Sequence, residues 1–325
     1  MSAEPRVIIE EILDAIEKDK LVLPTLPEVA IKIQELIDDP NVSAEQIVVL
    51  LTGDPLISAQ LIKSANSVLF IGKQPVESVR SAITRLGYRQ LRNLVMFVTM
   101  NKMFYAKNSL INNKMKLVWK NSRELAAVSY VLASHQSHLS PDQAMLAGLI
   151  HDIGVLPLCL YIEKHHSKIG EETLSELIQS CSNIIGTKLL QKWNFPPDMV
   201  QVAGEYNNLQ RESSLAPLAD YTDVVAIAKL QDPLGTKEVA WNTIAAVQRL
   251  GLSEEDCRNF LENFSERISL VAEMLGISRL STPKNAGLVS SIPDLPSPHK
   301  KSLSQNSRNS QGLFSKIMSL LTFWK

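Results

Sequence analysis

Apolar residues recur every three or four positions through most of the first 280 residues. In the segment 7–16, isoleucine and leucine return on one face of a helix, and the same period continues in Glu28–Asp38. No stretch alternates apolar and polar residues at a period of two for long. The pattern predicts an all-α fold, with later helices at about 54–67, 76–86, 89–104, 114–134, 143–151, 172–192, 198–206, 216–230, 238–250 and 254–275.

Polar residues at the expected helix ends support this division. Ser43 followed by Gln46 has the spacing of a capping box. Asp54 before Pro55 predicts another helix start, because aspartate favours the N-cap and proline the first helical position. Gly87 is placed to end the helix that begins near residue 76.

The composition changes at residue 281. Ser, Pro, Asn, Gln and Lys dominate 281–311, a composition that predicts a disordered linker. Residues 312–325 then have a helical pattern of apolar side chains, namely Leu313, Phe314, Ile317, Leu320, Leu321 and Trp324. This segment is too short to span a bilayer. Three interpretations stay open for it: docking on its own domain, binding in a groove of a partner protein, or lying on an anionic membrane surface.

Charge and cysteine content narrow the class of protein. The net charge of −1 gives no overall attraction to nucleic acid, and we expect no nucleic-acid partner. The arginines between Arg80 and Arg92 predict a solvated helix face. Residues 281–325 carry six basic residues against one acidic residue, so the nearly neutral total hides a charge asymmetry between this segment and the rest of the chain. Three scattered cysteines and the lack of a signal-peptide pattern predict a cytoplasmic protein, peripheral to the inner membrane if the tail binds lipid.

The chemically informative motif is His151-Asp152-Ile153-Gly154, at the end of an apolar segment. An adjacent His-Asp pair in this setting resembles the start of the metal site in HD phosphohydrolases. Such a site binds divalent metal through imidazole and carboxylate, and the metal generates a hydroxide that attacks phosphorus.

A set of motifs in a fixed order resembles the HDOD family, the HD-related output domain of bacterial signalling proteins. The motifs lie at about residues 20 to 210 and comprise Leu23-Pro24-Thr25-Leu26-Pro27-Glu28-Val29-Ala30, Asp54-Pro55-Leu56, Ala65-Asn66-Ser67, Ala82-Ile83 with Leu86-Gly87, Leu91-Arg92-Asn93-Leu94, Ala147 to Gly154, and Leu189-Leu190 with Trp193 and Pro196. The resemblance implies the following organisation: an N-terminal helix (1–20), an HDOD domain (21–210), C-terminal helices packed on it (211–280), a disordered linker (281–311) and an amphipathic helix (312–325).

The same resemblance implies that the metal site is degenerate. By register, Asn121 stands where the HD enzymes have their first histidine, and Lys229 stands in place of a late aspartate. A cation there would repel a metal ion. Other positions at which relatives carry metal-binding or catalytic residues are held by Val155, Ser182-Asn183 and Tyr206-Asn207-Asn208.

We therefore expect His151, Asp152 and Gly154 to be a remnant that fixes helix packing, with no catalytic residue, metal or cofactor. A live metal site and a nucleotide pocket without hydrolysis are the alternatives. The predicted function is a non-enzymatic signal-transduction module that acts through contacts with signalling proteins. The rivals are a metal-dependent phosphohydrolase or cyclic-nucleotide phosphodiesterase, and a membrane-associated scaffold that uses the tail.

Overall fold

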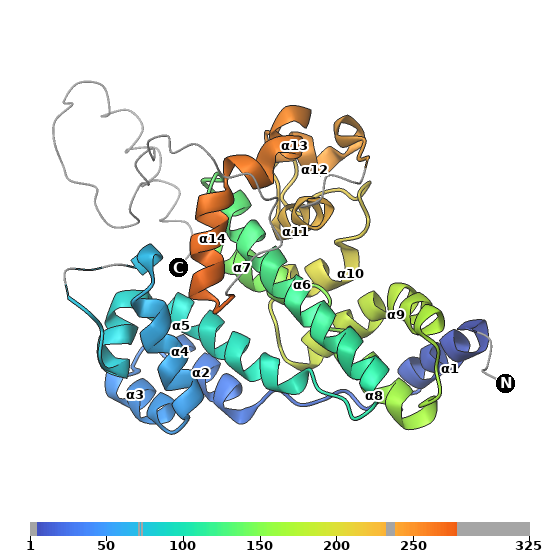
Figure 1. Cartoon of the computed structure of the whole chain (residues 1–325), viewed down its shortest axis with the longest axis horizontal. Helices are drawn as coiled ribbons and strands as arrows, with labels where there is room; N and C mark the ends of the chain where they lie inside the picture. The colour runs from blue at the N-terminus through green and yellow to red at the C-terminus, as the bar shows by residue number, and fades with distance from the viewer. Residues whose placement is uncertain (1–4, 71, 73, 232–237, 278–325) are drawn as a thin grey trace, which may run out of the picture. The chain divides into compact units, whose positions relative to one another are not determined.

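The computed structural model describes residues 5–70, 72, 74–231 and 238–277. Within these ranges the regular secondary structure is helical and contains no strand (Figure 1). The all-α prediction is confirmed. The predictions for residues 281–311 and 312–325 lie outside the described residues.

The first group of helices packs around one long helix. Helix α5 contacts α2, α3 and α4, and the short 3₁₀ helix η1 follows α4. The bounds are α2 (Glu28–Asp38), α3 (Ala44–Thr52), α4 (Pro55–Ala65), η1 (Val68–Phe70) and α5 (Val79–Met103). The predicted caps are present: Ser43 and Gln46 form the capping box of α3, and Asp54 accepts two backbone N–H groups at the start of α4.

Gly87 ends a helix, as predicted. Its φ of 76° is not helical and favours glycine, and the two helices that meet at this kink are counted together as α5. The predicted helices 76–86 and 89–104 are therefore the two arms of α5. The first arm starts at Val79 rather than 76, because Ser78 caps it through Ser81.

The second group is built on α6. Helices α7, α8 and α11 pack on α6, while α9 packs on α8, α10 and the N-terminal helix α1. The bounds are α1 (Pro5–Glu17), α6 (Ser109–Ala133), α7 (Pro141–Ile150), α8 (Val155–His165), α9 (Glu171–Lys192), α10 (Pro197–Glu205) and α11 (Tyr221–Leu230). Helix α6 begins five residues before the predicted start because Asn108 accepts the N–H groups of Leu110 and Ile111.

Helix α8 was not predicted from the pattern. Most of its residues from Val155 to Ile162 are buried, so no polar face marks the period of 3.6. The stretch Pro141–His165, which includes α7 and α8, is apolar and long enough to span a membrane by composition, but 83% of its apolar 18-residue window is buried inside the protein. That burial is typical of core helices.

The last described helices differ most from the prediction. The helix predicted at 216–230 starts only at Tyr221, because Asp220 caps it. The segment 238–250 contains the 3₁₀ helix η2 (Trp241–Thr243) and the short helix α12 (Ala245–Arg249). The helix predicted at 254–275 breaks at Phe264 into α13 (Glu254–Asn263) and α14 (Ser265–Met274), because the backbone of Phe264 (φ −114°, ψ 15°) leaves the helical region.

A buried ionic cluster ties α11 to the segments on either side. Arg211 donates to Asp220 at 2.6 Å and to Asp223 at 2.9 Å, and Arg249 donates to Asp223 at 2.6 Å. Asp223 is 1% exposed. Arg211 lies outside the α-helices, and Arg249 is the last residue of α12. Their ion pairs therefore hold the irregular segments on either side of α11 against that helix.

Candidate functional site

The His-Asp motif lies in a tight turn between two buried helices. Helix α7 ends at Ile150, residues 151–154 form the turn, and α8 starts at Val155. A Cβ atom on Gly154 would lie 2.0 Å from the carbonyl oxygen of Ser182, so only glycine lets the turn pack this closely on α9. This contact fixes the direction in which His151 and Asp152 leave the turn.

Four side chains from three regions meet at this turn. The Nζ of Lys229, in the last turn of α11, lies 3.1 Å from Nε2 of His151 and 3.1 Å from Oδ2 of Asp152. The hydroxyl of Tyr206, just after α10, donates to Oδ1 of Asp152. The rings of Tyr206 and His151 meet edge to face with centroids 4.9 Å apart. We call His151, Asp152, Tyr206 and Lys229 the HD cluster.

The hydrogen bonds assign the tautomer of His151. Its Nδ1 lies 2.7 Å from the carbonyl oxygen of Gly148, which can only accept, so Nδ1 carries a proton. Nε2 is then free to accept from the Lys229 ammonium. Nε2 also lies 3.2 Å from Oδ2 of Asp152. Two acceptors face each other at that distance, and the ammonium donates to both.

Charge in the HD cluster stabilises the ionised form of Asp152. Burial raises the pKa of this carboxyl, but the positive charge of Lys229 and the hydrogen bond from Tyr206 oppose that effect, and the net shift is to well below its ordinary value. Burial and the neighbouring Asp152 carboxylate raise the pKa of Tyr206. Tyr206 therefore stays a phenol that donates, and Asp152 stays a carboxylate that accepts.

The HD cluster does not fit a divalent metal. A metal would take Nε2 of His151 and Oδ2 of Asp152 as ligands, and these are the two atoms that the ammonium of Lys229 already contacts. Catalytic metal sites use three or more protein ligands and an open position. Over the described ranges, no group of three or more His, Cys, Asp or Glu residues is placed to hold a metal ion.

The other predicted positions have mixed outcomes. Lys229 lies at the His-Asp pair, as the register predicted. Asn121 is exposed on α6, and no hydrogen bond joins its side chain to the HD cluster in the described structure. Asn183 donates to the carbonyl of Gly204 at 3.2 Å. Tyr206 was interpreted only as the absence of a histidine, but its hydroxyl binds Asp152. The register itself was the signal for this role, since it placed Tyr206 where relatives have a ligand.

Three other described histidines serve contacts elsewhere. His138 lies 2.8 Å from the carbonyl oxygen of Ala219, and His166 lies 3.0 Å from Oε2 of Glu11 on α1. His135 packs edge to face on Phe264 with ring centroids 4.8 Å apart. His299 lies outside the described residues. The three cysteines are buried and free, as expected.

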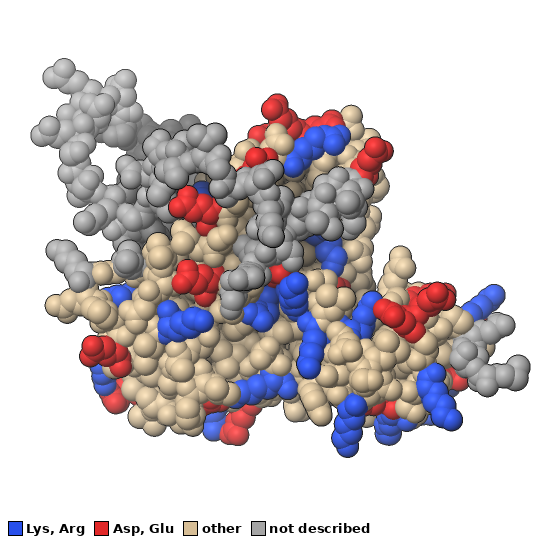
Figure 2. Space-filling view, in the orientation of Figure 1, with Lys and Arg blue, Asp and Glu red and all other residues tan. Residues whose placement is uncertain are grey.

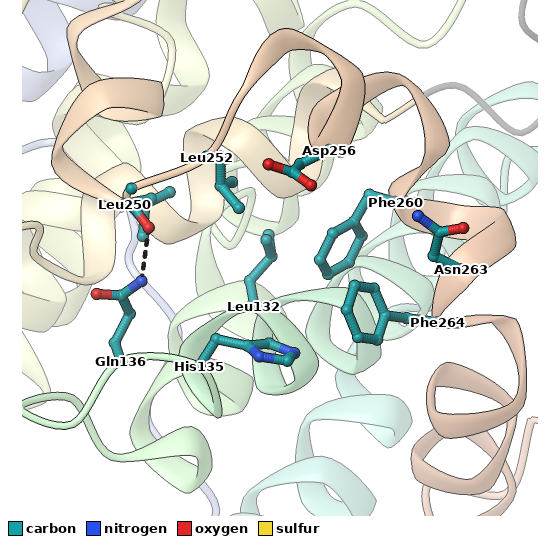
Figure 3. A pocket seen from close by; sticks show the side chains of 10 residues that line it. Leu132, His135, Gln136, Leu250, Leu252, Asp256, Phe260, Asn263 and Phe264 are labelled. Atoms are coloured by element: carbon teal, nitrogen blue, oxygen red, sulfur yellow. Dashed lines mark hydrogen bonds between the residues drawn. The ribbon is translucent and has the colours of Figure 1, made fainter. Parts of the chain in front are cut away.

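A separate cavity of about 290 Å³ lies between the end of α6 and α13 (Figure 3). Gln136 donates to the carbonyl of Leu250 at 2.8 Å, and the Asp256 carboxylate accepts from Ser253 in the capping box of α13. Burial and the charge of Arg267 lower the pKa of His135 in its wall. The cavity shares no residue with the HD cluster.

The surface charge does not form a single basic patch on the face shown in Figure 2. Lys and Arg side chains of the described residues lie among Asp and Glu side chains there. In the basic window noted above, Arg80 pairs with Glu45, and Arg85 donates to the backbone carbonyls of Ala65 and Gln74. These two arginines therefore serve contacts within the chain.

Comparison with known proteins settles the family. The model of the HDOD domain matches residues 23–209, which is more than half of the chain. The chain belongs to the HDOD family. The prediction from the ordered motifs is confirmed.

The individual proteins that this chain resembles are distant in sequence. A structure from Shewanella amazonensis SB2B, named as a candidate metal-dependent phosphohydrolase, has a TM-score of 0.69 and 26% identity, covering 83% of this chain and 99% of that one. A structure from Marinobacter aquaeolei VT8, named as a candidate signal transduction protein, has a TM-score of 0.56 and 23% identity, covering 80% and 60%. An uncharacterized protein of Treponema pallidum (strain Nichols) is 25% identical over 202 residues, which are 58% of this chain and 38% of that protein. The chain thus spans less than half the length of this curated relative.

Proposed function

We propose that this HDOD chain is a non-hydrolytic regulatory module of a signalling system, which acts through contacts with other proteins. The observation that carries the proposal is the position of Lys229, whose ammonium contacts both candidate ligand atoms of the His-Asp pair at 3.1 Å. The lysine supplies one positive charge where an HD enzyme needs a divalent cation.

The electrostatics make coexistence of the lysine and a metal costly. Two unit charges 4 Å apart in a protein environment repel by about 4 kcal/mol, and a divalent ion doubles that figure. A metal could bind only if Lys229 moved away or lost its proton. Either change would also remove the hydrogen bonds that now satisfy Asp152 and His151.

The rival function is a metal-dependent phosphohydrolase, and the name of the Shewanella relative favours it. The Marinobacter likeness supports the fold alone, and its name motivates a signalling role for the present chain. The rival requires metal at the HD cluster, so metal binding decides between the two.

The deciding experiment measures bound metal and phosphodiester hydrolysis together. The full chain, purified without chelator, is compared with the His151→Ala/Asp152→Ala variant by elemental analysis. Both are then assayed with manganese on bis(p-nitrophenyl) phosphate and on a cyclic dinucleotide. We expect no stoichiometric metal and no hydrolysis above the double variant. Stoichiometric metal and turnover that are both lost in the double variant would overturn the proposal.

A gain-of-binding variant gives the experiment a positive arm. Lys229→Asp removes the ammonium and supplies a carboxylate as a third candidate ligand beside His151 and Asp152. We expect manganese to raise the Tm of Lys229→Asp, because a ligand that binds only the folded state stabilises it. The unaltered chain should show no such rise.

The membrane-associated scaffold rests on the tail at 312–325, outside the described residues. Deletion of 312–325, followed by flotation with anionic and neutral vesicles, tests it. Binding of the full chain to anionic vesicles that the deletion abolishes would support that role. Equal behaviour of both chains would leave the tail without a membrane function.

A further inference from the structure

The last described helix, α14, bridges the two helix groups. It contacts α4 and η1 of the first group and α6 of the second (Figure 1). The apolar side chains that it buries are Ile268, Val271, Ala272, Met274 and Leu275, each at most 1% exposed. Four of them, at positions 268, 271, 272 and 275, follow the i, i+3, i+4, i+7 spacing of a helix that docks in a groove.

The groove between α4 and α6, in which α14 lies, also binds the end of this helix through polar side chains. The carbonyl oxygen of Met274 accepts from Ser64 Oγ at 2.7 Å and from Gln60 Nε2 at 3.0 Å. The carbonyl oxygen of Leu275 lies 3.5 Å from a guanidinium nitrogen of Arg123. The last carbonyls of a helix lack partners within the helix, so these donors select a helix C-terminus.

One contact in the groove is poorly matched. Gln90 is 2% exposed, and its amide nitrogen donates to the thioether sulfur of Met274 at 2.9 Å. A thioether is a weak acceptor. The amide oxygen of Gln90 is buried and has no hydrogen-bond partner in the described structure, and the same holds for Nε of Arg123. A side chain with both a donor and an acceptor at the Met274 position would satisfy Gln90 fully.

Helix α14 joins the preceding described chain at a break between two helices. The helix follows the break at Phe264, has no side-chain N-cap, and is the last described element of the chain.

We propose that the groove between α4 and α6 is a docking site for an amphipathic helix of a partner protein, and that α14 is a replaceable occupant in cis. The preferred partner helix ends in the groove, repeats the apolar spacing of α14, and has Gln or Asn in place of Met274. This inference rests on the proposed function, since it supplies the surface for the protein contacts.

Hydrogen exchange of the full chain tests whether α14 opens by itself. We expect residues 266–275 to exchange faster than the buried part of α6 at 125–133. Ser64→Ala should accelerate exchange in α14 by about fivefold, as expected for the loss of one hydrogen bond, with α6 unchanged. Ser67→Ala is the matched control, because Ser67 is buried beside Ser64 but donates to the Ser64 carbonyl instead. Equal protection of α14 and α6, with both variants affecting them alike, would overturn the proposal.

A labelled peptide tests the partner chemistry. The probe has the sequence of residues 262–277 with glutamine in place of Met274, and its binding is followed by fluorescence anisotropy. Val271→Ala weakens the cis helix and leaves the groove intact, so this variant should bind the probe about tenfold more tightly than the unaltered chain. Adding Ser64→Ala should weaken that binding.

Three outcomes would contradict this assignment. The absence of saturable binding to Val271→Ala would show that the groove is not a docking site. Equal affinity for the Met274 and glutamine peptides would show that the groove has no preference for a polar side chain at that position. A dimer formed by Val271→Ala would show that the occupant is a second copy of the chain. None of these results bears on metal binding, so the proposed non-hydrolytic function would still stand or fall on its own experiment.

Discussion

Replacing Lys229 with methionine tests whether its ammonium is the counter-charge of the HD cluster. The substitution keeps the length and much of the apolar surface of the side chain and removes the charge. It leaves the Asp152 carboxylate, whose side chain is 13% exposed, with only the Tyr206 hydroxyl and the neighbouring imidazole. Removal of one partner of a fully buried pair costs about 3–5 kcal/mol, and exposed pairs contribute about 0–1 kcal/mol.

The exposure of Lys229 decides where in this range the effect falls. Its side chain is 37% exposed, so water compensates part of the loss. We expect Lys229→Met to lower the free energy of unfolding by about 2–3 kcal/mol. For a chain of this size that corresponds to a fall in Tm of about 3–5 °C. Urea denaturation followed by circular dichroism measures the first quantity, and differential scanning fluorimetry measures the second.

Lys102→Met is the matched control. Lys102 also pairs with an aspartate, at 2.8 Å from Oδ2 of Asp54, but its side chain is 47% exposed and that of Asp54 is 26% exposed. Its replacement should cost about 1 kcal/mol or less. A double-mutant cycle with Asp152→Asn should show coupling, since Lys229→Met costs less once the carboxylate is neutral. If Lys229→Met costs no more than Lys102→Met and the cycle shows no coupling, the counter-charge argument is wrong.

Three further measurements follow from the same geometry. The folded-state pKa of Asp152 is lowered, so its contribution to stability is present above the unfolded pKa of about 3.9 and is lost as pH falls further. The difference in unfolding free energy between the unaltered chain and Asp152→Asn should therefore be largest near pH 7 and shrink below pH 4. Gly154→Ala should destabilise the fold by about 3 kcal/mol or more, because its Cβ would lie 2.0 Å from a backbone oxygen of α9. Gly170→Ala is the control, because nothing lies within 4 Å of a Cβ there, and it should cost about 1 kcal/mol or less. Thermal melts compare the two variants. Asp223→Asn should cost about 3–5 kcal/mol in urea denaturation, because it leaves two arginines short of a buried carboxylate.

The sequence predicted helices best where one face is polar. Glu28–Asp38 has the predicted bounds, and the caps at Ser43 and Asp54 form as expected. Helix α8 was missed because most of its residues are buried, which removes the polar half of the period. Local signals also favoured one helix across Phe264, and the break there depends on how α13 and α14 pack in three dimensions.

The candidate site was predicted in part. The resemblance to the HD enzymes placed Lys229 at the position of their late aspartate, and the contacts of its ammonium with His151 and Asp152 agree with that register. The register placed Tyr206 where relatives carry a ligand, but the hydrogen bond of its hydroxyl to Asp152 depends on the irregular chain after α10, which sets the position of the ring. The register also placed Asn121 at the His-Asp pair, but Asn121 is exposed on α6. A register carried along a helix of 25 residues does not determine which face of α6 meets α7.

The HD cluster shows why a His-Asp motif is weak evidence for catalysis. The turn at Gly154 brings a carboxylate and an imidazole nitrogen to within 3.2 Å of each other, and two acceptors at that distance need a cation or a proton between them. That requirement comes from the packing of α7, α8 and α9 and is independent of any reaction. A metal meets it in an enzyme, and an ammonium from α11 meets it in this chain. The residue opposite the pair, at position 229 here, is therefore more informative about hydrolysis than the pair itself.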